Sequence, residues 1–189
     1  MPIKTIAFTG PHGTGKTSLF NALTKYFIFE KLGLKVIEEV ARELSDRRQI
    51  IPENMTPDEF ADFQLAIAQE QVRQEQANKL FASDRSLYDF LAYSEMITTP
   101  AKADVLQYLE DQLHPYDVIF YVPICFPLTV NPIRQKVDPK FQRQIDVRLR
   151  QIYQARKINF VELEGKTTKE RANEVCRSLK IDYPFFDCL

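Results

Sequence analysis

Short apolar runs alternate with longer segments of helical spacing along most of the chain. The apolar runs predict five strands, at 3–9, 34–38, 79–83, 117–122 and 159–163. Apolar residues at helical spacing predict helices over 15–32, 39–48, 57–78, 87–96, 102–113, 141–156 and 168–179. Strands that alternate with helices favour a parallel sheet covered on both faces. The predicted fold is therefore one α/β domain over residues 1–189, with about five parallel strands.

Several segments between the strands carry more specific signals. The run Thr56-Pro57-Asp58-Glu59 combines a cap, a proline and acids, which mark a helix start, and Gly33 is expected to end the first helix. The glutamine-rich residues 64–76 are expected to face solvent, with a cleft border or a partner surface as the alternative. Residues 123–139 contain four prolines, so we expect a loop there and a lid over about 123–145.

Composition and charge narrow the class of protein. A hydrophobic content of 44% is ordinary for a soluble globular domain, and a net charge of −1 argues against nucleic-acid binding as the main function. The three cysteines, Cys125, Cys176 and Cys188, have no paired spacing, which is typical of reduced thiols. No apolar run reaches the length of a membrane span, and the first strand leaves no room for a signal peptide. We therefore expect a cytoplasmic protein that acts without a membrane.

Residues 10–17 carry the most specific signal in the chain. They read Gly-Pro-His-Gly-Thr-Gly-Lys-Thr and fit the phosphate-binding pattern G-x-x-x-x-G-K-[ST] between a predicted strand and a predicted helix. Glycines let backbone N–H groups wrap a phosphate chain at the start of a helix. Lys16 would place a charge on the β- and γ-phosphates, and the Thr17 hydroxyl would bind Mg²⁺. The expected nucleotide-binding residues are Gly10, His12, Gly13, Thr14, Gly15, Lys16, Thr17 and Ser18.

Acidic residues follow the second and third predicted strands, at the edge where parallel sheets bind ligands. Asp84 lies at the tip of the third strand and is the expected partner of Thr17 in holding Mg²⁺ or its waters. Glu38 and Glu39 follow the second strand, where a carboxylate could accept the proton of a substrate hydroxyl. The alternative is that these two acids only stabilise the first turn of a helix.

Five basic residues are candidates for binding anionic groups. Arg42 could bind an anion, and Arg85 either does so or forms a structural salt bridge. Arg148 projects into the apolar face of its helix, so it meets a carboxylate, points into a phosphate site or extends along the helix edge. Arg134 and Lys136 precede that helix and are candidate lid cations for the transferred phosphoryl group.

The motifs together resemble those of the small P-loop kinase-like ATPases of the NadR type, also called the AAA_28-like group, and of the wider nucleoside and nucleotide monophosphate kinases. The resemblance rests on the loop at 10–17 and on residues 39–43, Glu-Val-Ala-Arg-Glu. It rests also on Asp84-Arg85-Ser86, which is similar to the D-R or E-R-S motif of deoxynucleoside kinases. This family membership would imply a P-loop fold.

The resemblance also implies roles for individual residues. Lys16 and Thr17 would hold ATP and Mg²⁺, and Asp84 would lie near the metal. Glu39, or its neighbour Glu38, would contact the phosphate-accepting hydroxyl. The anionic groups would be handled by Arg42, Arg85 and Arg134.

These observations predict an ATP- and Mg²⁺-dependent phosphotransferase that acts on a nucleoside, a nucleoside-like metabolite or a nucleoside monophosphate. The alternative is an NTP-hydrolysing or NTP-binding regulatory protein without a small-molecule acceptor. Convergence of Glu39, Arg42 and Arg85 beside the γ-phosphate would favour the kinase. The aromatic residues 181–186 either cover an edge of the core or meet a second subunit in a homodimer.

Overall fold

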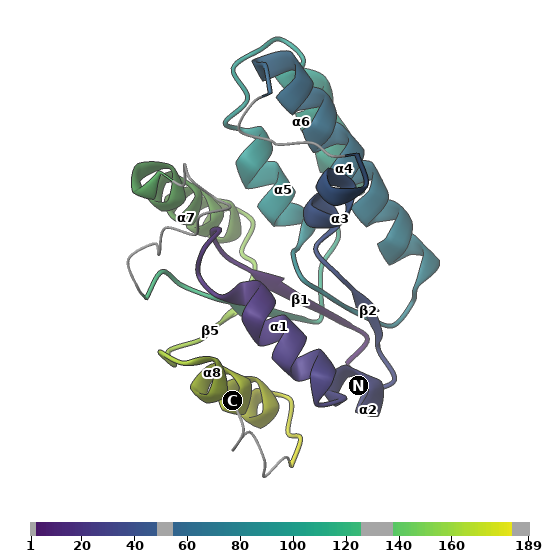
Figure 1. The fold of residues 1–189 in the computed structure, drawn as a ribbon, viewed down its shortest axis with the longest axis vertical. Helices are drawn as coiled ribbons and strands as arrows, with labels where there is room; N and C mark the ends of the chain where they lie inside the picture. The colour runs from purple at the N-terminus through teal and green to yellow at the C-terminus, as the bar shows by residue number, and fades with distance from the viewer. Residues whose placement is uncertain (1–2, 49–54, 126–137, 183–189) are drawn as a thin grey trace.

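The fold is built on five strands that all run parallel. The computed structural model describes residues 3–48, 55–125 and 138–182 (Figure 1). The strands lie in the order β2-β3-β1-β4-β5. Their bounds are β1 (Thr5–Thr9), β2 (Lys35–Ile37), β3 (Phe81–Ser83), β4 (Val118–Tyr121) and β5 (Val161–Glu162). The parallel α/β sheet predicted from the alternation of elements is confirmed.

Helices cover both faces of this sheet, as the sequence predicts. Two apolar clusters separate the layers: α1, α2 and α8 pack on one face, and α4, α5, α6 and α7 on the other, with α3 at the edge of the second group. The bounds are α1 (Lys16–Lys25), α2 (Ile28–Lys31), α3 (Val40–Arg48), α4 (Pro57–Ala77), α5 (Leu87–Ser94), α6 (Lys102–Gln112), α7 (Pro139–Ala155) and α8 (Thr168–Ser178). None of the helices in the described residues combines the length and the apolar character needed to cross a membrane.

The central strand β1 anchors both cores because its side chains alternate across the sheet. Phe8 points to the face of α1, where its ring stacks on Phe120 at 5.2 Å and meets Phe20 edge-on at 5.5 Å. Ala7 points to the opposite face, in the core shared with α5 and α7. All of these side chains are fully or almost fully buried. This packing fixes the end of β1, from which the loop at 10–17 starts.

Strand register brings the predicted functional segments to one edge of the sheet. Ala7 of β1 pairs with Ser83 of β3, and Ser83 also pairs with Ile37 of β2. Thr9 of β1 pairs with Tyr121 of β4. The residues that follow β1, β2 and β3 therefore emerge side by side, as the ligand-binding edge of a parallel sheet requires.

Two expectations about helices need correction. The helix expected over 15–32 is two helices, because Phe27 adopts a left-handed conformation (φ 58°) that ends α1 and lets Phe29 of α2 pack on Phe20 at 5.0 Å. The glutamine-rich part of α4 was expected to face solvent, but one side of it is buried. There Gln71 donates a hydrogen bond to Glu75 (2.6 Å), and Glu75 also accepts one from the Tyr116 hydroxyl (3.0 Å).

Other boundaries agree with the sequence. Gly33 follows α2 with φ 70°, and Thr56 and Glu59 form a reciprocal capping box at the start of α4. Most of the predicted lid, residues 126–137, lies outside the described residues, and its last part forms the first turns of α7. The prediction of one domain over the whole chain stays a prediction.

Candidate active site

The loop between β1 and α1 has the backbone that its glycines predict. Gly10, Gly13 and Gly15 have φ values of 132°, 74° and 86°, a region that side chains rarely adopt. A Cβ on Gly10 would also collide with the carbonyl oxygen of Val122, which follows β4. The loop therefore packs closely against the residue that follows β4, and its backbone conformation requires glycine.

The start of α1 lacks the acidic and capping side chains that are present at the starts of α4, α5 and α8. Gly15 is its N-cap, no side chain caps its amides, and its first turn contains no acidic residue. In contrast, α4, α5 and α8 each begin with a reciprocal capping box. Uncapped N–H groups and the helix dipole together favour an anion. This arrangement suits the phosphates of a nucleotide.

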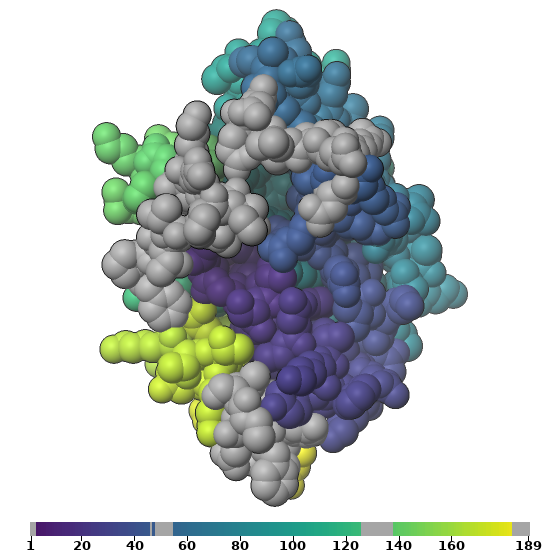
Figure 2. Space-filling view, viewed as in Figure 1, coloured from purple at the N-terminus to yellow at the C-terminus, as the bar shows by residue number. Residues whose placement is uncertain are grey.

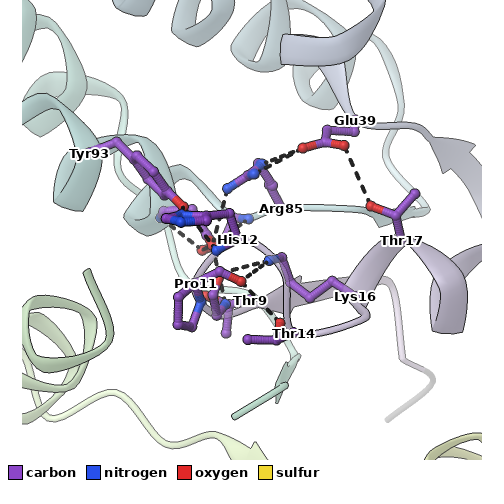
Figure 3. A network of polar contacts seen from close by, with 12 residues as sticks. Thr9, Pro11, His12, Thr14, Lys16, Thr17, Glu39, Arg85 and Tyr93 are labelled. Carbon is purple, nitrogen blue, oxygen red and sulfur yellow. Dashed lines mark hydrogen bonds and ion pairs between the residues drawn. The ribbon is translucent and has the colours of Figure 1, made fainter. Parts of the chain in front are cut away.

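Lys16 directs its ammonium group back over the loop (Figure 3). Its Nζ donates hydrogen bonds to the carbonyl oxygens of Gly10 (2.6 Å) and Pro11 (2.9 Å). Burial, and then the nearby Arg85 charge, lower the pKa of Lys16 to about 8. The residue is only 5% exposed, so a phosphate at the loop would meet a charge that water screens poorly.

Asp84 is a deeply buried carboxylate directly after β3. It is 2% exposed, and neither carboxylate oxygen has a hydrogen-bond partner among the described residues. Burial raises its pKa, although the Lys16 charge and the Thr17 hydroxyl work against that shift. A buried carboxylate beside a hydroxyl, facing a phosphate loop, fits a Mg²⁺ ion that also takes phosphate oxygens and water. Thr17 and Asp84 are therefore the residues that would hold the metal.

Glu39, which follows β2, contacts two arginines, and Figure 3 shows its contacts with Arg85 and Thr17. Its Oε1 accepts hydrogen bonds from Nε and Nη2 of Arg85 (3.2 and 2.9 Å), and its Oε2 lies 3.1 Å from Nη2 of Arg42. Oε2 also accepts a hydrogen bond from the Thr17 hydroxyl at 3.5 Å. Burial alone would raise the pKa of Glu39, but the positive charges of Arg85, Lys16 and Arg42 outweigh it and lower the pKa to about 2.

Arg85 joins this acid to the rest of the site. Its guanidinium lies 5.3 Å from the centre of the Tyr93 ring and 3.9 Å from a carboxylate oxygen of Asp89. Its φ of 151° is rare for a residue with a side chain. Strained backbone of this kind persists where the surroundings hold it in place, which is common at functional sites. The salt bridge that the sequence left as an alternative is therefore present, and it lies inside the cluster.

The structure distinguishes between the remaining candidates. Glu39 contacts the loop helix, whereas Glu38 is exposed to solvent. Arg42 reaches Glu39 with a side chain that is 48% exposed. Arg148 meets a carboxylate, Glu95 at the end of α5, which was one of its three alternatives. Arg134, and with it Lys136, lies outside the described residues.

Four contacts of the loop were missed by sequence reasoning. His12 donates its N–H to the Tyr93 hydroxyl (3.0 Å) and accepts a hydrogen bond at its carbonyl from Gln142 of α7 (2.7 Å). The buried Arg171 of α8 donates to the carbonyl oxygens of Thr14 (2.6 Å) and Gly165 (2.7 Å).

The fourth contact is made by Asp89, which accepts a hydrogen bond from the Gly10 N–H (3.2 Å). The S-x-x-D spacing of Ser86 and Asp89 predicts a capping box, and this was the only local signal for that residue. No spacing rule connects either Asp89 or Arg171 to the loop.

Comparison with known proteins agrees with this geometry. The family model AAA_28, described as an AAA domain, matches residues 5–171. The chain belongs to the AAA_28 family. No curated protein is similar enough in sequence to count as a relative of this AAA_28 domain.

Solved structures of NadR protein share the fold of this AAA_28 domain. NadR in complex with NR superposes with a TM-score of 0.71 at 14% identity, over 98% of this chain and 54% of that one. NadR in complex with NAD and AMP-PNP gives 0.68 at 16% identity, over 98% and 52%. The AAA_28 domain thus spans about half of the length of each NadR chain and has a P-loop nucleotide-kinase-like fold. The family and the fold expected from the motifs are both confirmed.

Proposed function

We propose that this AAA_28 domain is a cytoplasmic ATP- and Mg²⁺-dependent phosphotransferase whose acceptor is a hydroxyl of a nucleoside-like metabolite. The observation that carries the proposal is the position of Glu39. Its carboxylate is fixed by Arg85 and Arg42 and lies next to Thr17, at the start of the loop helix. A carboxylate beside the γ-phosphate position is suited to hold an acceptor hydroxyl in line for transfer.

The other residues supply charge neutralisation, which dominates phosphoryl transfer. The amides of the loop and Lys16 would bind the phosphates, and Thr17 with Asp84 would hold Mg²⁺. When held by these two residues, the ion would supply positive charge that offsets the charge of the phosphates. Arg85 would stabilise charge on the transferred group, a role for which Arg134 also remains a candidate.

The low pKa of Glu39 limits its chemical role. With a pKa of about 2 in these surroundings, Glu39 is ionised throughout the neutral range and is a poor proton acceptor in the ground state. It would orient the acceptor hydroxyl by a hydrogen bond and take its proton only late, as the bond to phosphorus forms. Late proton transfer is compatible with the loose transition state of phosphoryl transfer.

The charge around Glu39 also favours one class of acceptor. Both arginines that contact Glu39 in the described residues are engaged by its carboxylate. A neutral or cationic nucleoside would therefore fit better than a monophosphate, which would compete with Glu39 for the same cations. The solved NadR structures with NR and with AMP-PNP support a nucleoside-like acceptor and an ATP-like donor by analogy of fold.

The proposal is tested by ADP release from ATP and Mg²⁺ in the presence of nucleosides, nicotinamide riboside and nucleoside monophosphates. We expect strong stimulation by one nucleoside-like acceptor and formation of its phosphate ester. A control without acceptor measures hydrolysis by water. If no acceptor raises the rate of ADP release above the control, the result contradicts the kinase proposal and supports an NTP-hydrolysing regulatory protein.

A further inference from the structure

One buried carboxylate on α5 connects the two sides of the candidate site. Asp89 is fully buried, and its Oδ1 accepts the Gly10 N–H at 3.2 Å and lies 3.9 Å from Nη1 of Arg85. Its Oδ2 accepts hydrogen bonds from the backbone N–H (2.9 Å) and the hydroxyl (2.7 Å) of Ser86. The same side chain therefore closes the cap of α5, holds the first residue of the phosphate loop and faces Arg85.

One turn further along α5, Tyr93 repeats this double contact. Its hydroxyl accepts the backbone N–H of His12 (3.0 Å) and contacts Nδ1 of the same residue (2.9 Å), while its ring lies under the guanidinium of Arg85. Residues four apart lie on the same face of a helix. One face of α5 thus contacts the phosphate loop at Gly10 and at His12, and it also contacts Arg85. Figure 3 shows Tyr93 beside His12 and Arg85.

We propose that Asp89 and Tyr93 are positioning residues that set the distance between the phosphate loop and Arg85. Resting on the proposed function, this assigns α5 the task of aligning the donor phosphates with the group that stabilises transfer. A helix is stiff, so two contacts one turn apart fix both the position and the tilt of the loop. Small displacements at such a site are costly, since a shift of about 1 Å can reduce the rate about 10²-fold.

The chemistry of Asp89 makes it sensitive to a nearly isosteric change. Its neighbours in the described residues, the amides of Gly10 and Ser86, the Ser86 hydroxyl and the Arg85 guanidinium, all present hydrogens to it. An asparagine has one accepting oxygen and turns an NH₂ group toward the remaining donors. Asp89→Asn therefore disturbs either the loop or the cap, and removes the charge that faces Arg85.

Tyr93→Phe is the matched milder change. It removes the hydrogen bonds to His12 and keeps the ring under Arg85. Ser86→Ala is the control for a purely structural role, because it removes one donor to Asp89 Oδ2 and weakens the same helix cap. It keeps the contacts of Asp89 Oδ1 with Gly10 and Arg85. Each of the three variants changes one polar group, at the start of α5 or on it.

The experiment compares these three variants and the Asp89→Asn/Tyr93→Phe double variant by kcat, KM, Mg·ADP affinity and Tm. We expect Asp89→Asn to lower kcat about 10²-fold, and Tyr93→Phe about tenfold, with smaller changes in acceptor KM. The double variant should lose less than the product of the single losses, because both residues act on one unit. Ser86→Ala should lower Tm but leave kcat within about twofold.

The proposal is overturned if Asp89→Asn lowers kcat no more than Ser86→Ala does. Its failure is separable from that of the proposed function, because two readouts need no acceptor. If the wild-type protein shows no acceptor-dependent turnover, the kinase proposal fails. The positioning role is then decided by Mg·ADP affinity and by the amide NMR resonance of Gly10. Both should change in Asp89→Asn and stay as in the wild type in Ser86→Ala; equal behaviour of the two variants would refute the role.

Discussion

Two helix starts meet at the candidate site, and they are built in opposite ways. The first helix, α1, begins at Gly15 without a side-chain cap and without an acid in its first turn. The helix α5 begins at Ser86, with its amides covered by the capping box of Ser86 and Asp89. The third helical position is Ser18 in α1 and Asp89 in α5. An acid at the third position of α1 would compete with phosphate, and α1 has none there. In α5 the acid at this position, Asp89, accepts a hydrogen bond from Gly10 of the loop.

This difference has an energetic meaning. A side-chain cap contributes about 0.5–2 kcal/mol to the free energy of unfolding, and α1 forgoes it. The other boxed helices, α4 and α8, carry Glu59 and Glu170 at the third helical position. In Figure 2 the purple surface of the first elements lies between the yellow α8 and the blue residues that follow β2. The helix start that would bind ligand therefore lacks the stabilisation that capping boxes give to α4, α5 and α8.

The largest expected effect comes from removing the cation at the start of α1. Lys16→Ala should lower turnover about 10³-fold or more, since the charge on the transferred phosphate loses its main protein partner. The fold should persist, because the lost hydrogen bonds are to the loop itself. Turnover and circular dichroism check this, and unchanged turnover would remove the loop from the mechanism.

A smaller effect on turnover is expected at Glu39, the carboxylate that pairs with Arg85. Glu39→Gln should slow transfer about 10²-fold, as expected for loss of an acid–base group, while ATP affinity changes little. Its stability contribution has a definite sign. The pKa of Glu39 is lowered to about 2, so this contribution is present above its ordinary pKa and is lost as pH falls toward 2. A variant that loses only thermal stability would show that Glu39 is structural.

Asp84→Asn should separate stability from metal binding. We expect Mg²⁺ affinity to fall about 10–100-fold. Without Mg²⁺ the variant should be more stable than the wild type, because the folded-state pKa of Asp84 is raised and the ionised form opposes folding as pH rises through that range. Thermal melts with and without Mg²⁺ at neutral pH measure both effects. A fall in Tm without the metal would contradict the buried environment of Asp84.

Making the two helix starts alike is a direct test of the comparison. Ser18→Glu places an acid at the position that Asp89 occupies in α5 and should weaken nucleotide binding about tenfold by repulsion. It should also stabilise the free protein by about 0.3–1 kcal/mol through the helix dipole. Ser18→Gln has nearly the same size without the charge and serves as the control. Equal affinity of the two variants would show that phosphate does not approach α1.

The smallest effect is a change with pH. Lys16 has a pKa lowered to about 8, so its charge, and with it phosphate affinity, is present below that value and lost as pH rises through it. Mg·ADP affinity should therefore fall by up to about tenfold between pH 7 and 9. Lys16→Arg stays charged over this range and should lack that fall. A pH-independent affinity in the wild type would contradict the buried state of Lys16.

The sequence predicts the phosphate loop well, but it does not predict which distant residues contact the loop. Residues 10–17 are contiguous, so their chemistry is visible in one motif. Glu39 and Asp84 could be predicted from the sequence because parallel strands present their carboxyl ends at one edge of the sheet. In contrast, Asp89 is 79 residues away from Gly10, and only helix packing determines which amide it reaches.

The fold shows the same division between local and long-range information. Caps and glycines predict helix ends at Thr56 and Gly33, where the determining contacts are local. The burial of Gln71 and Glu75 could not be inferred, because their surroundings are completed by Tyr116, which lies 41 residues beyond Glu75. The break at Phe27 likewise depends on packing of the following residues against the sheet.

The bond from Arg171 to Thr14 joins residues that are 157 positions apart. During synthesis the phosphate loop leaves the ribosome before α8 does, because it precedes α8 in the chain. A nascent chain that ends before α8 contains the whole motif at 10–17. It lacks the Arg171 guanidinium that donates a hydrogen bond to the carbonyl oxygen of Thr14. The loop of such a chain should therefore reach its final conformation only after α8 has emerged and packed against it.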